Sequence, residues 1–220
     1  MTTTPDGGPY RQLTTPRAAA VAGIVFAALF ATSLVLMRLT LPADPFTPWA
    51  TRNDPRITVA LLMMPFAGIA FLWFLGVIRD RIGELEDRFF ATVVLGSGVL
   101  FLAMVFVATA TGGTALAVSR HSRTSHDEII SFGREFMLQI SNVYGVRMAA
   151  VFMISLATIW FRTALMPRLL VLITYLLALV LLVVVSHSLW VTLVFPSWVL
   201  VISVYLLATG RTESNRDHRT

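Results

Sequence analysis

Between Arg17 and Arg38 the chain reads AAAVAGIVFAALFATSLVLM (residues 18–37), a run of twenty residues without one charged side chain. At 1.5 Å of rise per residue, a helix of this length spans about 30 Å, which matches the hydrocarbon core of a bilayer. Further apolar runs follow at residues 57–78, 89–107, 143–161, 169–185 and 191–208. The sequence therefore predicts an all-α transmembrane bundle of about six spans.

The composition agrees with a membrane location. Hydrophobic residues make up 56% of the 220 residues and charged residues 13%, whereas soluble domains average about 45–50% and about 25%. A chain this short and apolar could not cover its core with polar surface in water, whereas lipid can face apolar side chains directly. We expect one membrane domain at residues 17–209, between a disordered cytoplasmic tail at 1–16 and a polar cytoplasmic tail at 210–220.

Charge and cysteine content exclude several classes of protein. The net charge is +5, and every basic residue is Arg. These residues lie at the ends of apolar runs, where positive charge sets topology, and not in the patch that nucleic-acid binding requires. Cysteine is absent, which excludes disulfides and thiolate metal sites. Because no nucleotide-binding loop, nucleophile elbow or zinc-protease motif occurs, we expect neither an enzyme nor a cofactor.

The distribution of Arg predicts the orientation. If the amino terminus is inside, ten Arg residues lie on the cytoplasmic side and seven lie outside. The short loops are clearer, because Arg162 and Arg168 flank the turn between spans four and five, whereas residues 186–190 carry no Arg. We therefore predict a plasma membrane protein with both termini in the cytoplasm.

The longest polar connection, at residues 119–142, lies outside on this topology. Ser125 and Glu128 have the spacing of a capping box. Five apolar residues follow at three- and four-residue steps: Ile129, Phe132, Phe136, Ile140 and Val143. This pattern predicts an amphipathic helix, either packed on the bundle or acting as a lid or partner-docking element. The helix lies in the outer interface or continues into span four as one rod, with Gly145 as the place for a bend.

Other local features bear on the boundaries and packing of the spans. The apolar pattern of span three extends to residue 118, and Gly112 and Gly113 predict a break within it. Spans five and six are joined by almost no loop, so we expect a tight turn at residues 186–188. Small residues recur every four positions on one face of span one, at Gly23, Ala27 and Ala31. Such a face lets helices pack closely, either within this chain or in a homodimer.

The polar residues that are costly to keep in a bilayer lie near the outer ends of the spans. Arg38 and Arg147 each lie about one turn inside the water boundary. A mid-membrane Arg costs roughly 2.5–3.5 kcal/mol unless it reaches the headgroups, pairs, or lines a wet cavity. Glu135 precedes Arg147 by three turns and is a candidate partner, and His187 could join the same cluster. We name Arg38, Arg147, His187 and Glu135 as candidate ligand-binding or partner-binding residues.

A second polar cluster contains His121, His126, Asp127 and Glu128. These residue types bind metal ions, but their spacing matches no established set of ligands. Acidic residues at a helix start are explained by the helix dipole. We therefore predict no metal site, and the alternative is a metal-dependent membrane enzyme that uses this cluster.

Three stretches resemble a known group of proteins: LLMMPFAGIAFLWFLGVIRDR (61–81), DRFFATVVLGSGVLFLAMVF (87–106) and NVYGVRMAAVFMISLATIWFRT (142–163). Together with FPSWVLVISVYLL (195–207), they are similar to a family of uncharacterised actinobacterial multi-pass membrane proteins, over most of residues 57–207. The resemblance implies a bacterial inner membrane location. It implies no activity and no site residues.

Three functions follow as hypotheses. The first is an accessory or structural membrane protein that binds other membrane proteins, or a second copy of itself, through helix contacts. The second is a transporter or permease for a small solute or a lipid, suggested by Pro65, the glycine pairs and Arg147. The third is the enzyme described above. Convergence of Arg38, Arg147 and His187 on one cavity would favour a ligand site, and their separation would favour the accessory function.

Overall fold

The computed structural model describes residues 15–40, 55–83, 88–121, 127–183 and 189–217. Within these ranges the chain is helical almost throughout and contains no strand, which confirms the predicted all-α class. The helices are α1 (Thr15–Thr40), α2 (Pro55–Gly83), α3 (Arg88–His121), α4 (Asp127–Gln139), the π-helix η1 (Ile140–Gly145), α5 (Val146–Thr163), α6 (Arg168–Val183), α7 (Leu189–Thr192) and α8 (Val194–Asp217). The tight turn predicted at residues 186–188 lies outside the described residues.

Four helical segments are long and apolar enough to cross a membrane: Ala18–Thr40, Pro55–Arg79, Phe89–Ser119 and Glu128–Thr163. Two shorter apolar helices, Arg168–Val183 and Val194–Ala208, correspond to the predicted fifth and sixth spans. Large apolar side chains such as Leu172 and Leu176 are exposed on α6, an arrangement that lipid accommodates and water does not. The apolar helices indicate a membrane protein.

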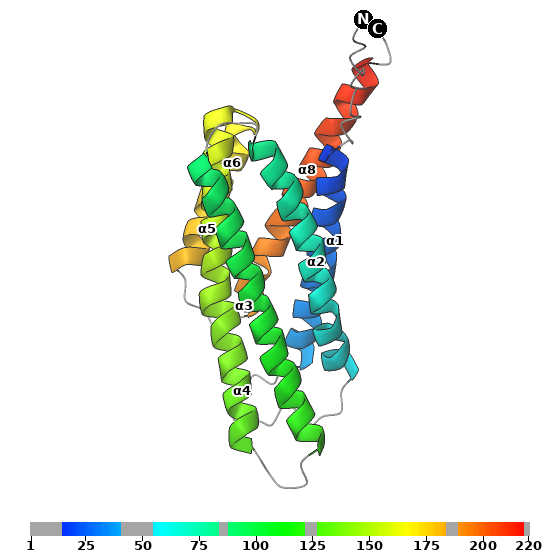
Figure 1. Cartoon of the computed structure of the whole chain (residues 1–220), viewed down its shortest axis with the longest axis vertical. Helices are drawn as coiled ribbons and strands as arrows, with labels where there is room; N and C mark the ends of the chain where they lie inside the picture. The colour runs from blue at the N-terminus through cyan, green and yellow to red at the C-terminus, as the bar shows by residue number, and fades with distance from the viewer. Residues whose placement is uncertain (1–14, 41–54, 84–87, 122–126, 184–188, 218–220) are drawn as a thin grey trace, which may run out of the picture.

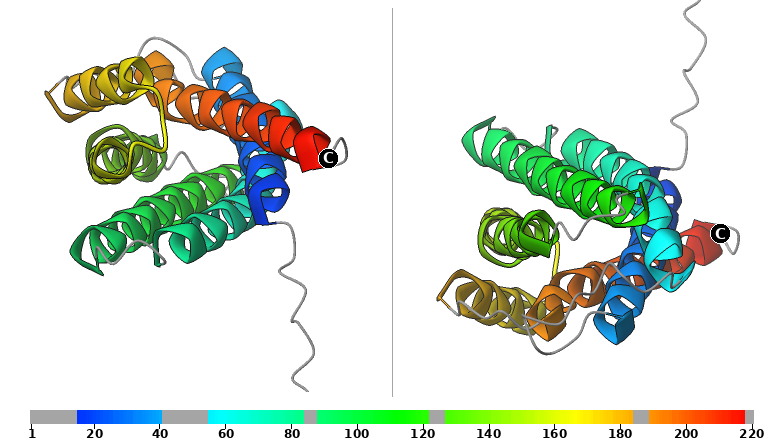
Figure 2. Two further views of the ribbon diagram at one scale, coloured as in Figure 1. Left: turned by 90° about the horizontal axis from the view of Figure 1, so that it is seen from above. Right: turned by 90° about the horizontal axis from the view of Figure 1, so that it is seen from below.

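Two sets of helices build the bundle. α1 packs between α2 and α8, and α5 packs between α3 and α6, while contacts between α2 and α3 join the two sets (Figures 1 and 2). α1 begins and α8 finishes at the same end of the bundle (Figure 1), which we call the terminal end. We call the opposite end, where α3 finishes and α4 begins, the hairpin end. There α3 and α4 extend beyond α1 and α2 (Figure 1).

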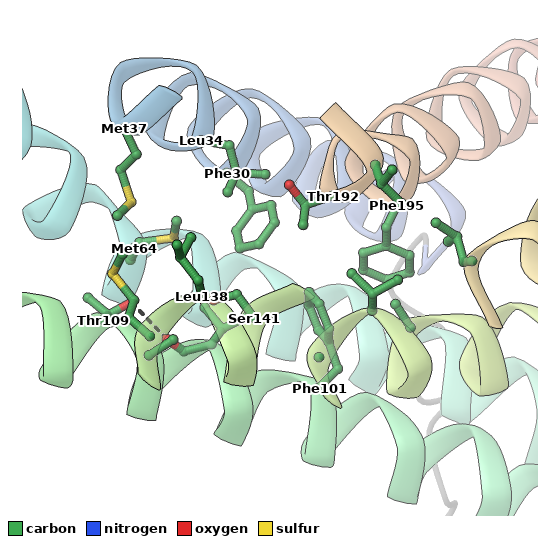
Figure 3. A pocket seen from close by; sticks show the side chains of 18 residues that line it. Phe30, Leu34, Met37, Met64, Phe101, Thr109, Leu138, Ser141, Thr192 and Phe195 are labelled. Atoms are coloured by element: carbon green, nitrogen blue, oxygen red, sulfur yellow. Dashed lines mark hydrogen bonds between the residues drawn. The ribbon is translucent and has the colours of Figure 1, made fainter. Parts of the chain in front are cut away.

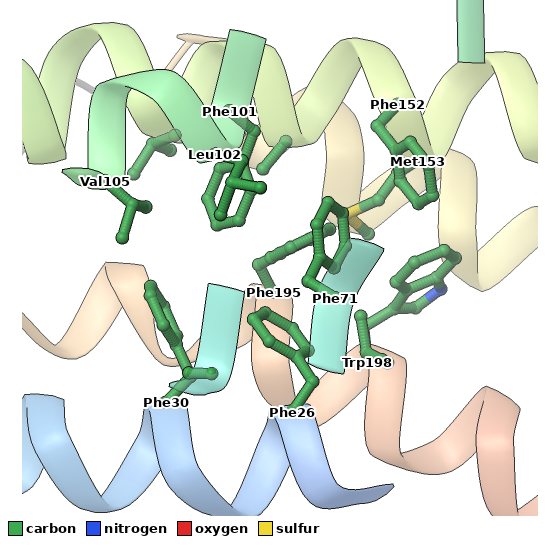
Figure 4. Close-up of a cluster of buried hydrophobic side chains, with 14 of the residues drawn as sticks. Phe26, Phe30, Phe71, Phe101, Leu102, Val105, Phe152, Met153, Phe195 and Trp198 are labelled. Carbon is green, nitrogen blue, oxygen red and sulfur yellow. The ribbon is translucent and has the colours of Figure 1, made fainter. Parts of the chain in front are cut away.

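Phenylalanines from five helices meet in the middle of the bundle. We call this cluster the aromatic core, and Figure 4 shows its members among other buried side chains: Phe26 of α1, Phe71 of α2, Phe101 of α3, Phe152 of α5 and Phe195 of α8. The ring centroids of Phe101 and Phe195 lie 4.7 Å apart, and those of Phe26 and Phe71 lie 4.9 Å apart. Such pairs contribute about 0.5–1.5 kcal/mol each beyond the area that they bury.

Polar side chains add links between neighbouring helices. The indole nitrogen of Trp198 in α8 donates a hydrogen bond to the Thr174 hydroxyl of α6 at 2.9 Å. The hydroxyl oxygens of Thr158 and Tyr175 lie 2.8 Å apart and join α5 to α6. In membranes, bonds of this kind average about 0.6 kcal/mol. They link the short helix α6 to α8 and to α5.

The break predicted at Gly112 and Gly113 is wrong, because α3 is continuous from Arg88 to His121. A Cβ on Gly112 would come within 2.7 Å of the Met137 sulfur in α4, so this glycine leaves room for the Met137 side chain between the two helices. That packing outweighs a helix-propensity cost of about 1 kcal/mol. Gly23 has a similar role, since a side chain there would collide with Ser203 of α8 and Phe74 of α2. This part of the small-residue face of α1 therefore packs within the chain.

Candidate functional site

α4, η1 and α5 form one continuous helical rod, as one of the two sequence alternatives predicted. Its apolar part, Glu128–Thr163, has 36 residues and is therefore about 54 Å long, compared with about 30 Å for the hydrocarbon core. Figure 1 shows that the rod extends beyond α1 and α2 at the hairpin end. We call α4 together with residues 112–121 of α3 the projecting hairpin.

The rod changes helix type where the projecting hairpin joins the bundle. The Val146 amide donates a hydrogen bond to the Ser141 carbonyl five residues earlier, which is the bonding of a π-helix. The extra residue per turn rotates the side chains that follow relative to those that precede. Gly145, predicted as the site of a bend, is instead the last residue of η1. Short π-helices of this kind are frequent at functional sites.

Asn142 lies inside η1 and is buried. Neither atom of its side-chain amide has a hydrogen-bond partner among the described residues. A buried polar group without a partner costs about 1–3 kcal/mol. The sequence places Asn142 beside Arg147 but gives no sign of its burial, because the change to π-helical bonding alters which residues of the rod face inward.

The first residues of the apolar stripe predicted for α4 are exposed and do not pack on the bundle. Ile129, Phe132 and Phe136 are 53%, 68% and 42% exposed, and the rings of Phe132 and Phe136 stack with centroids 5.8 Å apart. The helix packs on α3 through a smaller face, where a Cβ on Gly133 would lie 3.0 Å from the Cβ of Ala115. Close approach of the two backbones therefore decides which face is buried. We call Ile129, Phe132 and Phe136 the outer aromatic face.

The charged residues of the rod pair locally. Arg134 is buried, and its Nη1 lies 3.0 Å from Oε1 of the exposed Glu135. Of the alternatives for Arg147, a pair with Glu135 is therefore not the one seen among the described contacts. Arg147 instead donates from Nη1 to the Val143 carbonyl at 2.9 Å, one turn toward the hairpin end. This direction agrees with a side chain that extends toward the membrane boundary. Arg134, which is buried next to Gly133, is not among the candidate residues that the sequence indicates.

The other candidate residues are placed only in part. Arg38 lies in the last turn of α1 and is half-buried. His187 and His126 lie outside the described residues, as do the side chains of His121 and Asp127. In the part of the chain that the structure describes, no three His, Cys, Asp or Glu residues are grouped so that they could hold a metal ion.

A cavity lies inside the bundle between the aromatic core and the hairpin end, bounded by the last turns of α1 and α4 (Figure 3). It contains about 670 Å³ of space free of atoms, part of it open to the outside. Its walls come from α1, α2, α3, the rod, α6, α7 and α8, and they are almost entirely apolar. Arg38 and Arg147 do not line it. The two arginines therefore do not meet at this cavity.

Comparisons with known proteins found no match for this chain: no family model, no curated protein and no solved structure matches it. The geometry defines a helical membrane protein with a projecting hairpin and an apolar internal cavity. The resemblance to actinobacterial membrane proteins stays a prediction.

Proposed function

We propose that this chain is an accessory membrane protein that binds another protein through the outer aromatic face of its projecting hairpin. The observation that carries the proposal is the exposure of Ile129, Phe132 and Phe136 on a segment of the rod that extends past the length needed to cross a bilayer. Large apolar side chains that are grouped outside the hydrocarbon region mark interaction sites. Aromatic anchors of this kind commonly dominate the binding energy of interfaces.

The charges around the outer aromatic face indicate the chemistry of the partner. Glu128 and Glu135 are exposed on the same helix, where Glu135 also pairs with the buried Arg134, and acidic side chains at the rim of an interface favour a basic partner. Anionic lipid headgroups would be repelled by them. The partner is therefore a protein surface with an apolar groove flanked by Arg or Lys. The absence of Arg38 and Arg147 from the described lining of the cavity also supports the accessory function.

The lipid form of the alternative function, a transporter or permease, rests on a different observation, the internal cavity. A route for a small polar solute has less support, because charged side chains are absent from the described lining of the cavity.

We place the protein in a bacterial plasma membrane with both termini in the cytoplasm, and the projecting hairpin then lies outside. α1 begins and α8 finishes at one end (Figure 1), which is compatible with that topology.

The absence of cysteine makes the orientation testable by a single substitution. Ser131→Cys introduces a thiol on the exposed side of α4. A membrane-impermeant maleimide should label this thiol on intact cells. Labelling only after the membrane is permeabilised would place the projecting hairpin in the cytoplasm and contradict the orientation.

Partner binding is tested by a photo-cross-linking amino acid at position 132 in the full chain in living cells. The matched control carries the same amino acid in place of Trp73, which is 69% exposed on α2 and faces lipid in this proposal. We expect a discrete protein adduct at 132 and none at 73, and Glu128→Lys should weaken the adduct. An adduct with a second copy would identify a homodimer. Equal adducts at both positions, or none at 132, would contradict the proposal.

A further inference from the structure

The cavity follows the inner side of the rod toward the hairpin end. Its lining extends from Met137 in α4 to Ala149 in α5, which is a length of about 18 Å along a helix. Figure 3 shows Met37 and Met64 toward one end of the cavity and Phe101 toward the other. Such an elongated shape suits a linear, flexible molecule better than a ring system.

The cavity offers almost no polar group to a ligand. Its described lining has three hydroxyls, those of Thr109, Ser141 and Thr192. The Thr109 hydroxyl donates to the Val105 carbonyl at 2.8 Å, and Thr192 is also engaged in an interaction. A bound water needs two to four polar partners, and a polar solute needs a comparable number. Three hydroxyls, one of which already donates its proton within its own helix, cannot supply them over a wall of this length, so the ligand has to be apolar.

We propose that this cavity takes one acyl chain of a membrane lipid. Apolar cavities stay dry and take up apolar molecules, and acyl chains are the apolar molecules that surround a membrane protein. An unfilled space of this kind loses dispersion contacts along its walls, which a chain would restore. Met37, Met64 and Met137 line one part of the cavity, and their flexible side chains can adjust its width.

The experiment uses phosphatidylglycerol with a photoreactive diazirine in one acyl chain, in vesicles that contain the full-length protein. After illumination, the labelled residues are located by mass spectrometry. We expect label on Leu138, which lines the cavity, as well as on Leu172, which is exposed on α6. Ala108→Leu should reduce the label on Leu138 about tenfold, equivalent to 1.4 kcal/mol, because it adds a side chain to the cavity wall. Ala110→Leu is the matched control, since Ala110 is exposed on the same helix.

The labelling experiment tests the acyl-chain site independently of partner binding by the outer aromatic face. Labelling of Leu172 but not Leu138 in the unmodified protein would overturn it, and this comparison requires no variant to fold. An equal decrease for Ala108→Leu and Ala110→Leu would overturn it as well. Lipid labelling and protein cross-linking at position 132 are separate measurements, so either proposal can fail while the other stands.

Discussion

The middle of the bundle and the part toward its hairpin end use similar apolar residues in different ways. Around the aromatic core, side chains from five helices pack against one another, and Phe71 and Phe152 are completely buried. Toward the hairpin end, the walls of the cavity are equally apolar but do not meet. Phe101 and Phe195 belong to both regions, because they pack in the aromatic core and line the cavity.

The difference follows from the lengths of the helices. α6 has 16 residues and is therefore about 24 Å long, whereas the rod beside it is more than twice as long. α7 and the start of α8 lie at the level of the cavity and contribute Val191, Thr192 and Phe195 to its walls. A close-packed region determines the fold. Where α6, α7 and α8 are shorter than the rod beside them, space is left for a ligand. The longer helices, α3 and the rod, continue past this level and can contact a partner.

The largest effect is expected in the aromatic core. Phe71 makes ring contacts with Phe26, Phe101, Phe152 and Phe195. Phe71→Ala should cost about 3 kcal/mol, the lower end of the range for buried phenylalanines, because lipid reduces the transfer contribution. In detergent this corresponds to a decrease in melting temperature of about 6–12 °C.

The control for this prediction lies on the same helix. Phe66 is 57% exposed, so Phe66→Ala should change the melting temperature little. Equal decreases for the two variants would mean that the aromatic core is no more important to the fold than the lipid-facing surface.

A smaller effect is expected where α1 meets α2 and α8. Gly23→Leu places a side chain against Ser203 and Phe74, and overpacking of this kind costs typically 1–3 kcal/mol. Gly76→Leu is the matched control, because a Cβ there meets nothing within 4 Å. Thermal unfolding in the same detergent should show a lower melting temperature for Gly23→Leu only. A Gly23→Leu variant as stable as the control would argue that α1 does not pack closely at this position.

The sequence predicted the class of fold and the limits of most helices, because apolar runs and their flanking arginines are properties of single segments. It failed where two segments have to be considered together. Gly112 was expected to break α3, and its role became clear only from Met137 on the facing helix. The outward direction of Phe132 and the burial of Arg134 depend on the fit between Gly133 and Ala115. The cavity was not predictable, because its walls come from seven parts of the chain.

At Asn142, in the part of the rod that borders the hairpin end, we expect an effect on stability of opposite sign. Its buried amide has no hydrogen-bond partner among the described residues, so Asn142→Leu removes an unsatisfied polar group without leaving a void. Such a replacement is neutral or stabilising, and we expect a gain of about 1 kcal/mol, or about 2–4 °C in melting temperature. A loss of stability would show that the amide has a partner, and the hairpin end would then be as fully satisfied as the aromatic core.

The smallest effect on stability is expected on the projecting hairpin. Phe132 contacts Phe136 but is 68% exposed, so Phe132→Ser should change the free energy of unfolding by no more than about 0.5 kcal/mol. If the outer aromatic face binds a partner, the same substitution should still weaken co-purification of that partner, because aromatic anchors dominate interfaces. Melting curves and co-purification of one preparation measure both quantities. A marked loss of stability would indicate instead that Phe132 supports the fold. The outer aromatic face would then be part of the packing of the protein and not a surface for a partner.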